Sequence, residues 1–391
     1  MGLAASSVEL GSQPTSVVSP DLVDTHEQGS CRAEHLQSLT VSFNGGGGWD
    51  LCWSIELEAG LRVSKARYTT PQGRTFAILN EASLAQIDVP YDDGKHEQLD
   101  LPGFGLLTSQ LRPVDCPGGQ RLSAPEHPES LCAIVQQDPL RYAWSDYDFG
   151  SGNHAAPGKC LLIYTITPAS WYTYATKWRL CDDGSIVPSV DAGGTLSPHY
   201  FGDEKNGQPV GPGQSTFAMS HFHNIFWRLQ FDLGGHYMSQ IDDHVDGRRH
   251  EIMEEVVSLE TVRDRADNRF WRSVSTTLRN DDHHVVSYDL RLLGDGKYKS
   301  SEMGRTYTNH DLYITEDSPC ERLASENLHP PCATTVSDYV DGQHLTRPIV
   351  WVQISHHHIP RDEDQPIMNQ HSQGFVISPR NLTASNELVR K

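Results

Sequence analysis

The sequence predicts an all-β protein folded as a large antiparallel β-sandwich. Apolar and polar residues alternate, as in strands with one buried face, along segments 49–68, 158–168, 223–233, 286–294 and 347–358. Clusters of Gly, Pro, Asn and Asp interrupt these segments as turns and loops do, at 44–50, 181–188 and 204–214. Only residues 249–267 suggest a helix, and no internal repeat occurs.

Length and charge limit the class of protein. The 391 residues suffice for one large β domain, and we expect a disordered segment over 1–35 followed by a single domain over 36–391. The formal net charge of −20 disfavours nucleic acid and anionic membrane surfaces as partners. No apolar run is long enough to span a membrane. These features favour a small-molecule or protein partner.

The cysteines favour an oxidising compartment. Eight cysteines form four pairs of near neighbours, and none has the C-x-x-C spacing of a zinc ribbon or a thioredoxin-type site. Cys160 and Cys181 would lie at the open end of a β-hairpin that carries Trp171 and Tyr172. With the glycosylation sequon at Asn381, this predicts a secreted protein whose signal peptide lies outside this sequence. The alternative is a cytosolic protein with inert thiols.

Two histidine motifs point to a metal site. His221 and His223 are two residues apart at the start of a predicted strand, so both side chains leave the same face. His356 and His358 also share a face, while His357 points the other way. Three neutral imidazoles suit copper or zinc. Each motif alone is a weak signal, because single histidines on strands are more often solvated or core residues.

The residues around these histidines resemble the catalytic domain of copper amine oxidases. Residues 357–381 are similar to the C-terminal block of that family, and residues 221–232 to its H-x-H strand. Upstream, residues 84–94 resemble its Val-Pro-Tyr element and residues 99–119 its Asp-containing loop followed by Cys-Pro. The resemblance runs from about Trp49 to Asn381.

The resemblance implies the sandwich fold of that catalytic domain, a homodimer and a copper site. It assigns His221, His223 and His358 as the metal ligands, and it leaves His356 and His357 out of the site. It also implies a disulfide between Cys116 and Cys132.

The same resemblance assigns catalytic roles. Asp100 matches the general base that removes the α-proton of the substrate, and Tyr91 matches the phenol that hydrogen-bonds the quinone oxygen. Tyr172 matches the tyrosine that copper and dioxygen convert to topaquinone. From the residues alone, Asp100 is equally well a turn residue before Pro102, and the hairpin aromatics an ordinary packed pair.

The topaquinone signature T-x-x-N-Y-[DE] is incomplete. Pro168 replaces its Thr, Trp171 its Asn and Thr173 its acidic residue. The indole of Trp171 adds bulk and removes the hydrogen-bonding group of Asn. We therefore predict an unmodified Tyr172, which forms the wall of a substrate pocket together with Trp171 and Tyr174.

Three functions remain open. The first is a biosynthetic enzyme that has lost quinone chemistry and holds an apolar, unsaturated polyketide or terpenoid for a non-oxidative step such as a hetero-Diels–Alder cycloaddition. The second is a compact copper amine oxidase that converts primary amines to aldehydes, ammonia and hydrogen peroxide. The third is a copper- or ligand-binding module without turnover.

Overall fold

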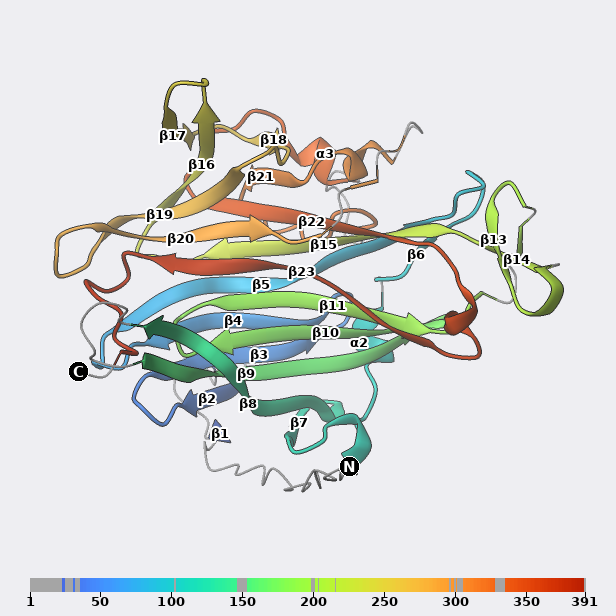
Figure 1. The fold of residues 1–391 in the computed structure, drawn as a ribbon, viewed down its shortest axis with the longest axis horizontal. Helices are drawn as coiled ribbons and strands as arrows, with labels where there is room; N and C mark the ends of the chain where they lie inside the picture. Colours follow the sequence, from blue (N-terminus) through green and yellow to red (C-terminus); the bar gives the residue numbers. More distant parts are fainter. Residues whose placement is uncertain are drawn as a thin grey trace, which may run out of the picture.

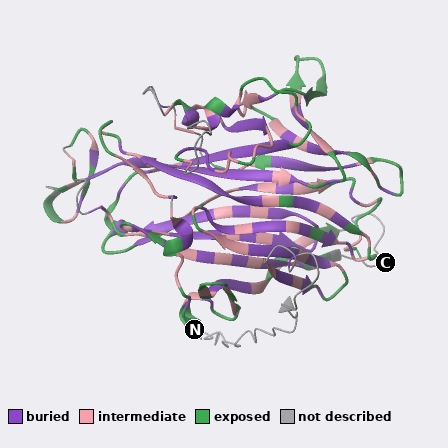
Figure 2. Ribbon diagram, turned by 180° about the vertical axis from the view of Figure 1, so that it is seen from behind, coloured by how far each residue is buried: buried purple, intermediate pink, exposed green. Residues whose placement is uncertain are grey.

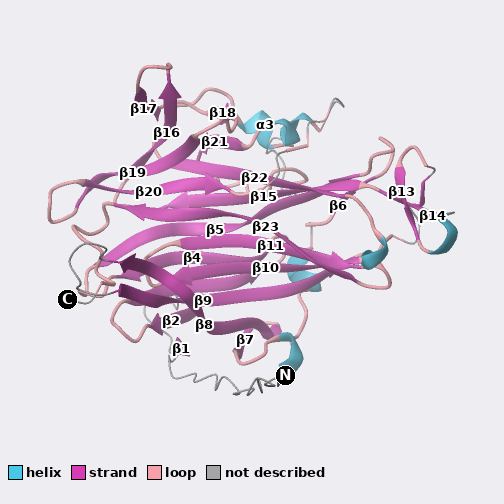
Figure 3. Cartoon of the chain, in the orientation of Figure 1, coloured by secondary structure: helices cyan, strands magenta, loops and turns pink. Residues whose placement is uncertain are grey.

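The structure is a computed structural model of the chain. It describes residues 23–24, 31, 36–101, 103–145, 153–197, 201–202, 204–214, 216–294, 297–298, 300, 305–327 and 335–389. Most of the segment predicted to be disordered, 1–35, lies outside these residues, and the division into one domain over 36–391 stays a prediction. The described chain is dominated by two large antiparallel sheets (Figures 1 and 3). The all-β prediction is confirmed.

The first sheet has ten strands in the order β1-β2-β3-β4-β5-β15-β22-β21-β18, with β6 paired to β5. Their bounds are Val23–Asp24 (β1), Gln37–Ser42 (β2), Gly48–Glu56 (β3), Gly60–Thr69 (β4), Thr75–Pro90 (β5), His221–Phe231 (β15), Pro348–His358 (β22), Leu312–Glu316 (β21), Thr261–Arg263 (β18) and Glu97–Leu99 (β6). Strands β5, β15 and β22 lie inside this sheet, although they are far apart in the sequence.

The second sheet has ten strands in the order β17-β16-β19-β20-β23-β11-β10-β9-β8-β7. Their bounds are His250–Val257 (β17), His236–Val245 (β16), Arg269–Arg279 (β19), Val285–Leu292 (β20), Met368–Arg380 (β23), Ile186–Gly194 (β11), Tyr172–Cys181 (β10), Asn153–Ala169 (β9), His127–Ser145 (β8) and Gln120–Ala124 (β7). The predicted hairpin is β9–β10, with Tyr172 paired to Ala169 across its turn.

Smaller elements complete the described chain. A three-stranded sheet has the order β12-β14-β13, with bounds Phe201–Gly202 (β12), Thr216–Met219 (β14) and Gly207–Val210 (β13). The helices are short: Phe104–Leu107 (α2), Val336–Tyr339 (α3), and the 3-10 turns Pro113–Asp115 (η1), Pro212–Gln214 (η2), Thr306–Asn309 (η3) and Asp362–Asp364 (η4). α2 follows Asp100 in the sequence and η4 follows His358, so each of these two candidate site residues is followed by a short helical turn.

The two large sheets share one core. Trp178 of β10 meets Trp227 of β15 edge to face, with ring centroids 5.2 Å apart, and Phe375 of β23 contacts the same indole at 5.9 Å. The indole Nε1 of Trp49 on β3 donates a hydrogen bond of 2.8 Å to the carbonyl oxygen of Cys181 on β10. Buried and partly buried residues alternate along many strands, as Figure 2 shows. Side-chain packing between β10 and β15, which belong to different sheets, brings the hairpin against the strand that carries His221 and His223.

The helix suggested for residues 249–267 is wrong. Residues 250–257 form β17, which pairs with β16 in continuous register from Met238↔Val257 to Val245↔His250. The hairpin supplies backbone hydrogen bonds, and the β-branched Ile252 and Val256 favour the extended conformation. Ile252, Met253 and Val256 are each more than half exposed, so most of the apolar spacing that suggested a helix face lies in solvent, while Val257 reaches the core.

Between cysteines that the structure describes, three disulfides join near neighbours in the sequence: Cys31–Cys52, Cys116–Cys132 and Cys160–Cys181. The last lies at the open end of the β9–β10 hairpin, where Cys160 and Cys181 are directly paired, and both predicted bridges are confirmed. Cys320 is also disulfide-bonded, and Cys332 lies outside the described residues.

Replacing both members of the Cys160–Cys181 bridge by Ala should lower the free energy of unfolding by about 3 kcal/mol, because the cross-link restricts the unfolded chain. The Cys31–Cys52 bridge closes a loop with the same sequence separation of 21, so its double Ala variant is a matched control with the same expected loss. Urea denaturation measures both. A loss near zero for either variant would contradict the expectation.

Candidate metal centre and active site

The register of two strands brings the three predicted metal ligands together. β15 and β22 are antiparallel, and His221 lies directly opposite His358 while His223 lies opposite His356. His221, His223 and His358 are buried, and one ring nitrogen of each lies within 4.8 Å of the other two. His357, on the other face, stacks on Phe222 with 4.0 Å between ring centroids. The side-chain period of two along each strand produces this separation.

Hydrogen bonds on the outer side fix the tautomers of two histidines. Nδ1 of His221 donates to the carbonyl oxygen of Met219 at 3.2 Å, and Nε2 of His358 donates to Oδ2 of Asp364 at 3.0 Å. The inner nitrogens, Nε2 of His221 and Nδ1 of His358, lie 3.3 Å apart. In these tautomers both inner nitrogens carry lone pairs and no proton.

Burial keeps the three imidazoles neutral. It lowers the pKa of His221 to about 3 and lowers the pKa of His223 and of His358. Asp364 opposes the effect at His358 by hydrogen bonding to its ring. Neutral rings with inward lone pairs are the protonation state that a transition-metal ion requires of histidine.

A hydrogen-bond chain links the third histidine to the candidate base. The hydroxyl of Tyr174 donates to Oδ2 of Asp100 at 2.6 Å and accepts from Nδ1 of His223 at 3.2 Å. Tyr174, predicted as a pocket wall, is fully buried in this linking position. Burial raises the pKa of Asp100 to about 6, and the hydrogen bond from Tyr174 opposes that rise. Asp100 therefore titrates close to neutrality, as a general base requires.

Tyr172 lies at the centre of the cluster. Its hydroxyl is 2.7 Å from Nε2 of His221 and 2.9 Å from Nδ1 of His358, and Sδ of Met368 lies 3.8 Å away. One phenol has one proton, so it bonds only one of the two lone pairs at a time. Burial raises the pKa of Tyr172 well above its usual value.

The other two predicted residues flank Tyr172. The ring of Tyr91 lies 4.8 Å from that of His221, and the backbones of these two residues form a β-bridge. Trp171 forms the tip of the hairpin, is half-buried and packs against the main core. Its carbonyl oxygen accepts a hydrogen bond of 3.0 Å from Thr195, and Gly194 approaches it so closely that a Cβ there would lie 2.2 Å from the oxygen. This contact pins the turn before Tyr172.

Three further residues of the site have no role predicted from the sequence: Asp364, Met368 and Met219. Asp364 stands in the acidic stretch six residues after His358, and this proximity is the signal that could have identified it. Met368 lies within the block of residues 357–381 that resembles the family, whereas Met219 gives no sequence signal, because only the tertiary fold places it beside the histidines.

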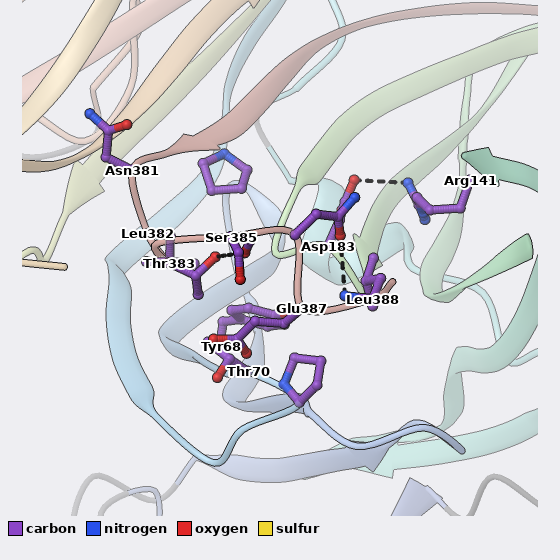
Figure 4. A pocket seen from close by; sticks show the side chains of 13 residues that line it. Tyr68, Thr70, Arg141, Asp183, Asn381, Leu382, Thr383, Ser385, Glu387 and Leu388 are labelled. Carbon is purple, nitrogen blue, oxygen red and sulfur yellow. Dashed lines mark hydrogen bonds and ion pairs between the residues drawn. The ribbon is translucent and has the colours of Figure 1, made fainter. Parts of the chain in front are cut away.

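The structure also contains a cavity away from the three histidines, at the C-terminal end of β23. Its volume is about 390 Å³, and Arg141 is ion-paired with Asp183 at its wall, at 2.9 Å (Figure 4). Asn381 of the sequon also lines it. None of the three histidines is among its lining residues. A cavity of about 50 Å³ lies beside Tyr91, with Glu97 and Arg305 in its wall.

Comparisons with known proteins agree with this geometry. Residues 40–390 match the family described as copper amine oxidase, enzyme domain. The primary amine oxidase of Arthrobacter sp. (strain P1) is 26% identical over 365 residues, which cover 81% of this chain and 55% of that protein. The histamine oxidase of Arthrobacter globiformis is 23% identical over 383 residues, covering 87% and 55%. The chain thus spans about half the length of these relatives.

Solved structures show the same fold. A copper-containing benzylamine oxidase from Hansenula polymorpha superposes with a TM-score of 0.76 at 19% identity, covering 89% of this chain and 60% of that one. An Aspergillus nidulans amine oxidase gives 0.75 at 16% identity, covering 99% and 56%. The predicted sandwich of the amine-oxidase catalytic type is confirmed, and the chain belongs to the copper amine oxidase family, over its enzyme domain.

Proposed function

We propose that this chain oxidises a small primary amine, with copper held by His221, His223 and His358. The observation that carries the proposal is the position of the Tyr172 hydroxyl, within hydrogen-bond distance of two of these three histidines. The names of the relatives, primary amine oxidase and histamine oxidase, support the same class of reaction.

The donor set fits copper. Nitrogen ligands favour copper(II) over the other divalent first-row ions. The lone pairs of His221 and His358 face each other at 3.3 Å, an unfavourable contact that a cation between them would remove. When bound, copper with dioxygen supplies the oxidising chemistry by which the family makes its quinone from the tyrosine at this position. Met219 and Asp364 orient His221 and His358 toward the ion, as hydrogen-bonding partners behind metal ligands do.

Asp100 is positioned to take a proton from the carbon next to the amine. Asp100 is half-buried, and its carboxylate accepts a hydrogen bond from the hydroxyl of Tyr174, which holds one oxygen in place and favours the ionised form. With a pKa of about 6, Asp100 is mostly ionised at neutral pH and can accept the proton. The small cavity beside Tyr91 offers an approach from the surface, and in its wall the carboxylate of Glu97 is ion-paired with Arg305 at 2.6 Å.

The residues that depart from the topaquinone signature affect the surroundings of the Tyr172 ring less than the sequence suggests. Pro168 and Thr173 are paired across the hairpin, and alternation places both on the face opposite Tyr172. Trp171 precedes the tyrosine in the turn of the hairpin. This arrangement supports oxidation of Tyr172 over our expectation of an unmodified residue.

Trp171 nevertheless motivates a second candidate. Its half-buried indole, together with Tyr91 and Tyr172, would hold an apolar, unsaturated substrate, and Asp100 or a phenol would hydrogen-bond a polarised carbonyl. That site would perform a non-oxidative cyclisation of the hetero-Diels–Alder kind. The third candidate function is binding of copper or a ligand without turnover.

Location and assembly follow from other features. The disulfides suggest an extracellular or secretory-pathway protein. Among the described residues, no helix is long and apolar enough to cross a membrane. Asn381 is exposed, in keeping with glycosylation there. Exposed apolar side chains on β17 support the homodimer, because a monomer leaves Ile252, Met253 and Val256 in water.

The oligomeric state is tested by charging β17. Ile252 and Val256 lie on one face of the strand, so the double substitution Ile252→Asp, Val256→Asp should convert a dimer to a monomer in analytical ultracentrifugation. The control is Glu251→Asp, Glu255→Asp on the neighbouring positions, which keeps the charge and should stay dimeric. A wild-type protein that sediments as a monomer would rule out the β17 contact.

Tyr172→Phe should abolish amine-dependent hydrogen peroxide production while copper still binds, because Phe cannot be oxidised to the quinone and the three histidines remain. Copper-reconstituted wild type, exposed to air, should react with phenylhydrazine and show the added oxygens on the peptide that contains Tyr172. The matched control is Tyr164→Phe in the same hairpin. It removes a hydroxyl that donates a hydrogen bond to the carbonyl oxygen of Asp115 in η1. Amine turnover by Tyr172→Phe would exclude this role for Tyr172.

An unmodified Tyr172 after aerobic copper loading would reject the amine oxidase. Conversion of an unsaturated substrate without oxygen consumption would then identify the second candidate.

The rate should rise with pH through about 6 as Asp100 loses its proton, because only the carboxylate accepts a proton from substrate. Asp100→Asn should lower kcat by about 10²–10⁴-fold with copper retained. Tyr174→Phe removes a hydrogen bond to the ionised form and should move the acidic limb of the kcat profile to higher pH. The exposed Asp246→Asn is the control. A limb that stays in place in Tyr174→Phe would disconnect Tyr174 from the base.

A further inference from the structure

A second group of metal-binding side chains adjoins the first. One nitrogen each of His358 and His371 and one carboxylate oxygen of Asp364 lie within 4.8 Å of one another. They come from the end of β22, from η4 and from β23, so the loop between the two strands folds back over His358. The imidazole of His371 lies 5.2 Å from that of His358, between ring centroids.

The ring of His358 spans both groups. Its Nδ1 faces His221 and Tyr172, and its Nε2 faces Oδ2 of Asp364 at 3.0 Å. Histidine can bind one metal ion through each nitrogen once both protons are gone. The position of His358 therefore allows two ions to share one imidazole.

The second group contains polar atoms that the protein itself does not satisfy. Among the described residues, Nε2 of His371 and Oδ1 of Asp364 are buried and have no hydrogen-bond partner. The side chain of Asp364 is 1% exposed, and its Oδ1 forms an ion pair with Nε of Arg361 at 3.6 Å, a distance too long for a hydrogen bond. Buried polar atoms without partners are destabilising, so this pair points to a ligand between them.

We propose that His358, Asp364 and His371 bind a second divalent ion of the zinc type, bridged by His358 to the first. Two nitrogens and one carboxylate oxygen are donors that zinc prefers, and three protein ligands leave its fourth position for water. Binding replaces the proton on Nε2 of His358, which passes to solvent. The resulting imidazolate and the carboxylate of Asp364 together balance the charge of the ion. The partly exposed ring of His371 gives the ion a route from the surface.

The competing explanation gives Asp364 only an orienting role for His358, as carboxylates behind metal-bound histidines commonly have. It accounts for the 3.0 Å contact but leaves the buried nitrogen of His371 without a function. The two explanations differ in how many ions the chain binds, and this number does not depend on whether Tyr172 is oxidised.

Metal content tests the proposal. The full chain is stripped with chelator, loaded with one equivalent of copper(II), then with zinc(II), passed through a gel-filtration column and analysed by inductively coupled plasma mass spectrometry. We expect one copper and one zinc per chain. His371→Gln should retain one copper and lose its zinc, whereas the exposed His344→Gln should retain both. Zinc absent from the wild type, or retained in full by His371→Gln, would overturn the proposal.

A spectroscopic signal tests the bridge independently of protein stability. Cobalt(II) in place of zinc should diminish the copper electron paramagnetic resonance signal of the wild type through the shared ring of His358, and His371→Gln should restore that signal. A copper signal unchanged by bound cobalt would show that the two ions do not share His358. Copper content and amine turnover are measured on the same samples, so loss of zinc with copper kept concerns only the second site.

Discussion

The antiparallel register of β15 and β22 determines the geometry on which the site depends. It sets His221 against His358, and the pairing of β15 with β5 on its other edge fixes the strand from both sides. A slip of one residue would turn His221 and His223 to the opposite face and separate them from His358. Nearly every residue of β15 is buried, so such a slip would also expose apolar surface, and the core opposes it.

Desolvation then sets the chemistry. The same burial that lowers the pKa of the histidines raises the pKa of Tyr172 and of Asp100. All of these shifts favour neutral forms, so without a cation the imidazoles and the phenol of Tyr172 are neutral, while Asp100, with a pKa of about 6, stays mostly ionised at neutral pH. A divalent ion reverses this preference for the groups closest to it, because its charge stabilises lone pairs and phenolate.

The sequence predicts much of this arrangement because its signals are local. Alternating segments predict the strands, the H-x-H spacing predicts one face of β15, and the near-neighbour cysteines predict the bridge at Cys160 and Cys181. Signals that depend on exposure mislead: the apolar spacing in residues 249–267 suggests a buried helix face, but Ile252, Met253 and Val256 of β17 face solvent. The contacts of Tyr174, Asp364 and His371 could not be predicted, because they form between elements whose packing no local pattern encodes.

The position of Tyr172 supports the proposed cation at this site even though the hairpin departs from the family signature. Its hydroxyl can donate its single proton either to Nε2 of His221, at 2.7 Å, or to Nδ1 of His358, at 2.9 Å. Whichever nitrogen it leaves has a buried lone pair with no donor from the phenol, at a cost of about 1–3 kcal/mol. Moving the ring away would strand both lone pairs, and protonating a histidine is opposed by burial. A metal ion would accept the lone pairs of all three histidines at once and leave the phenol free, which is why this hydrogen bonding supports the proposed ion.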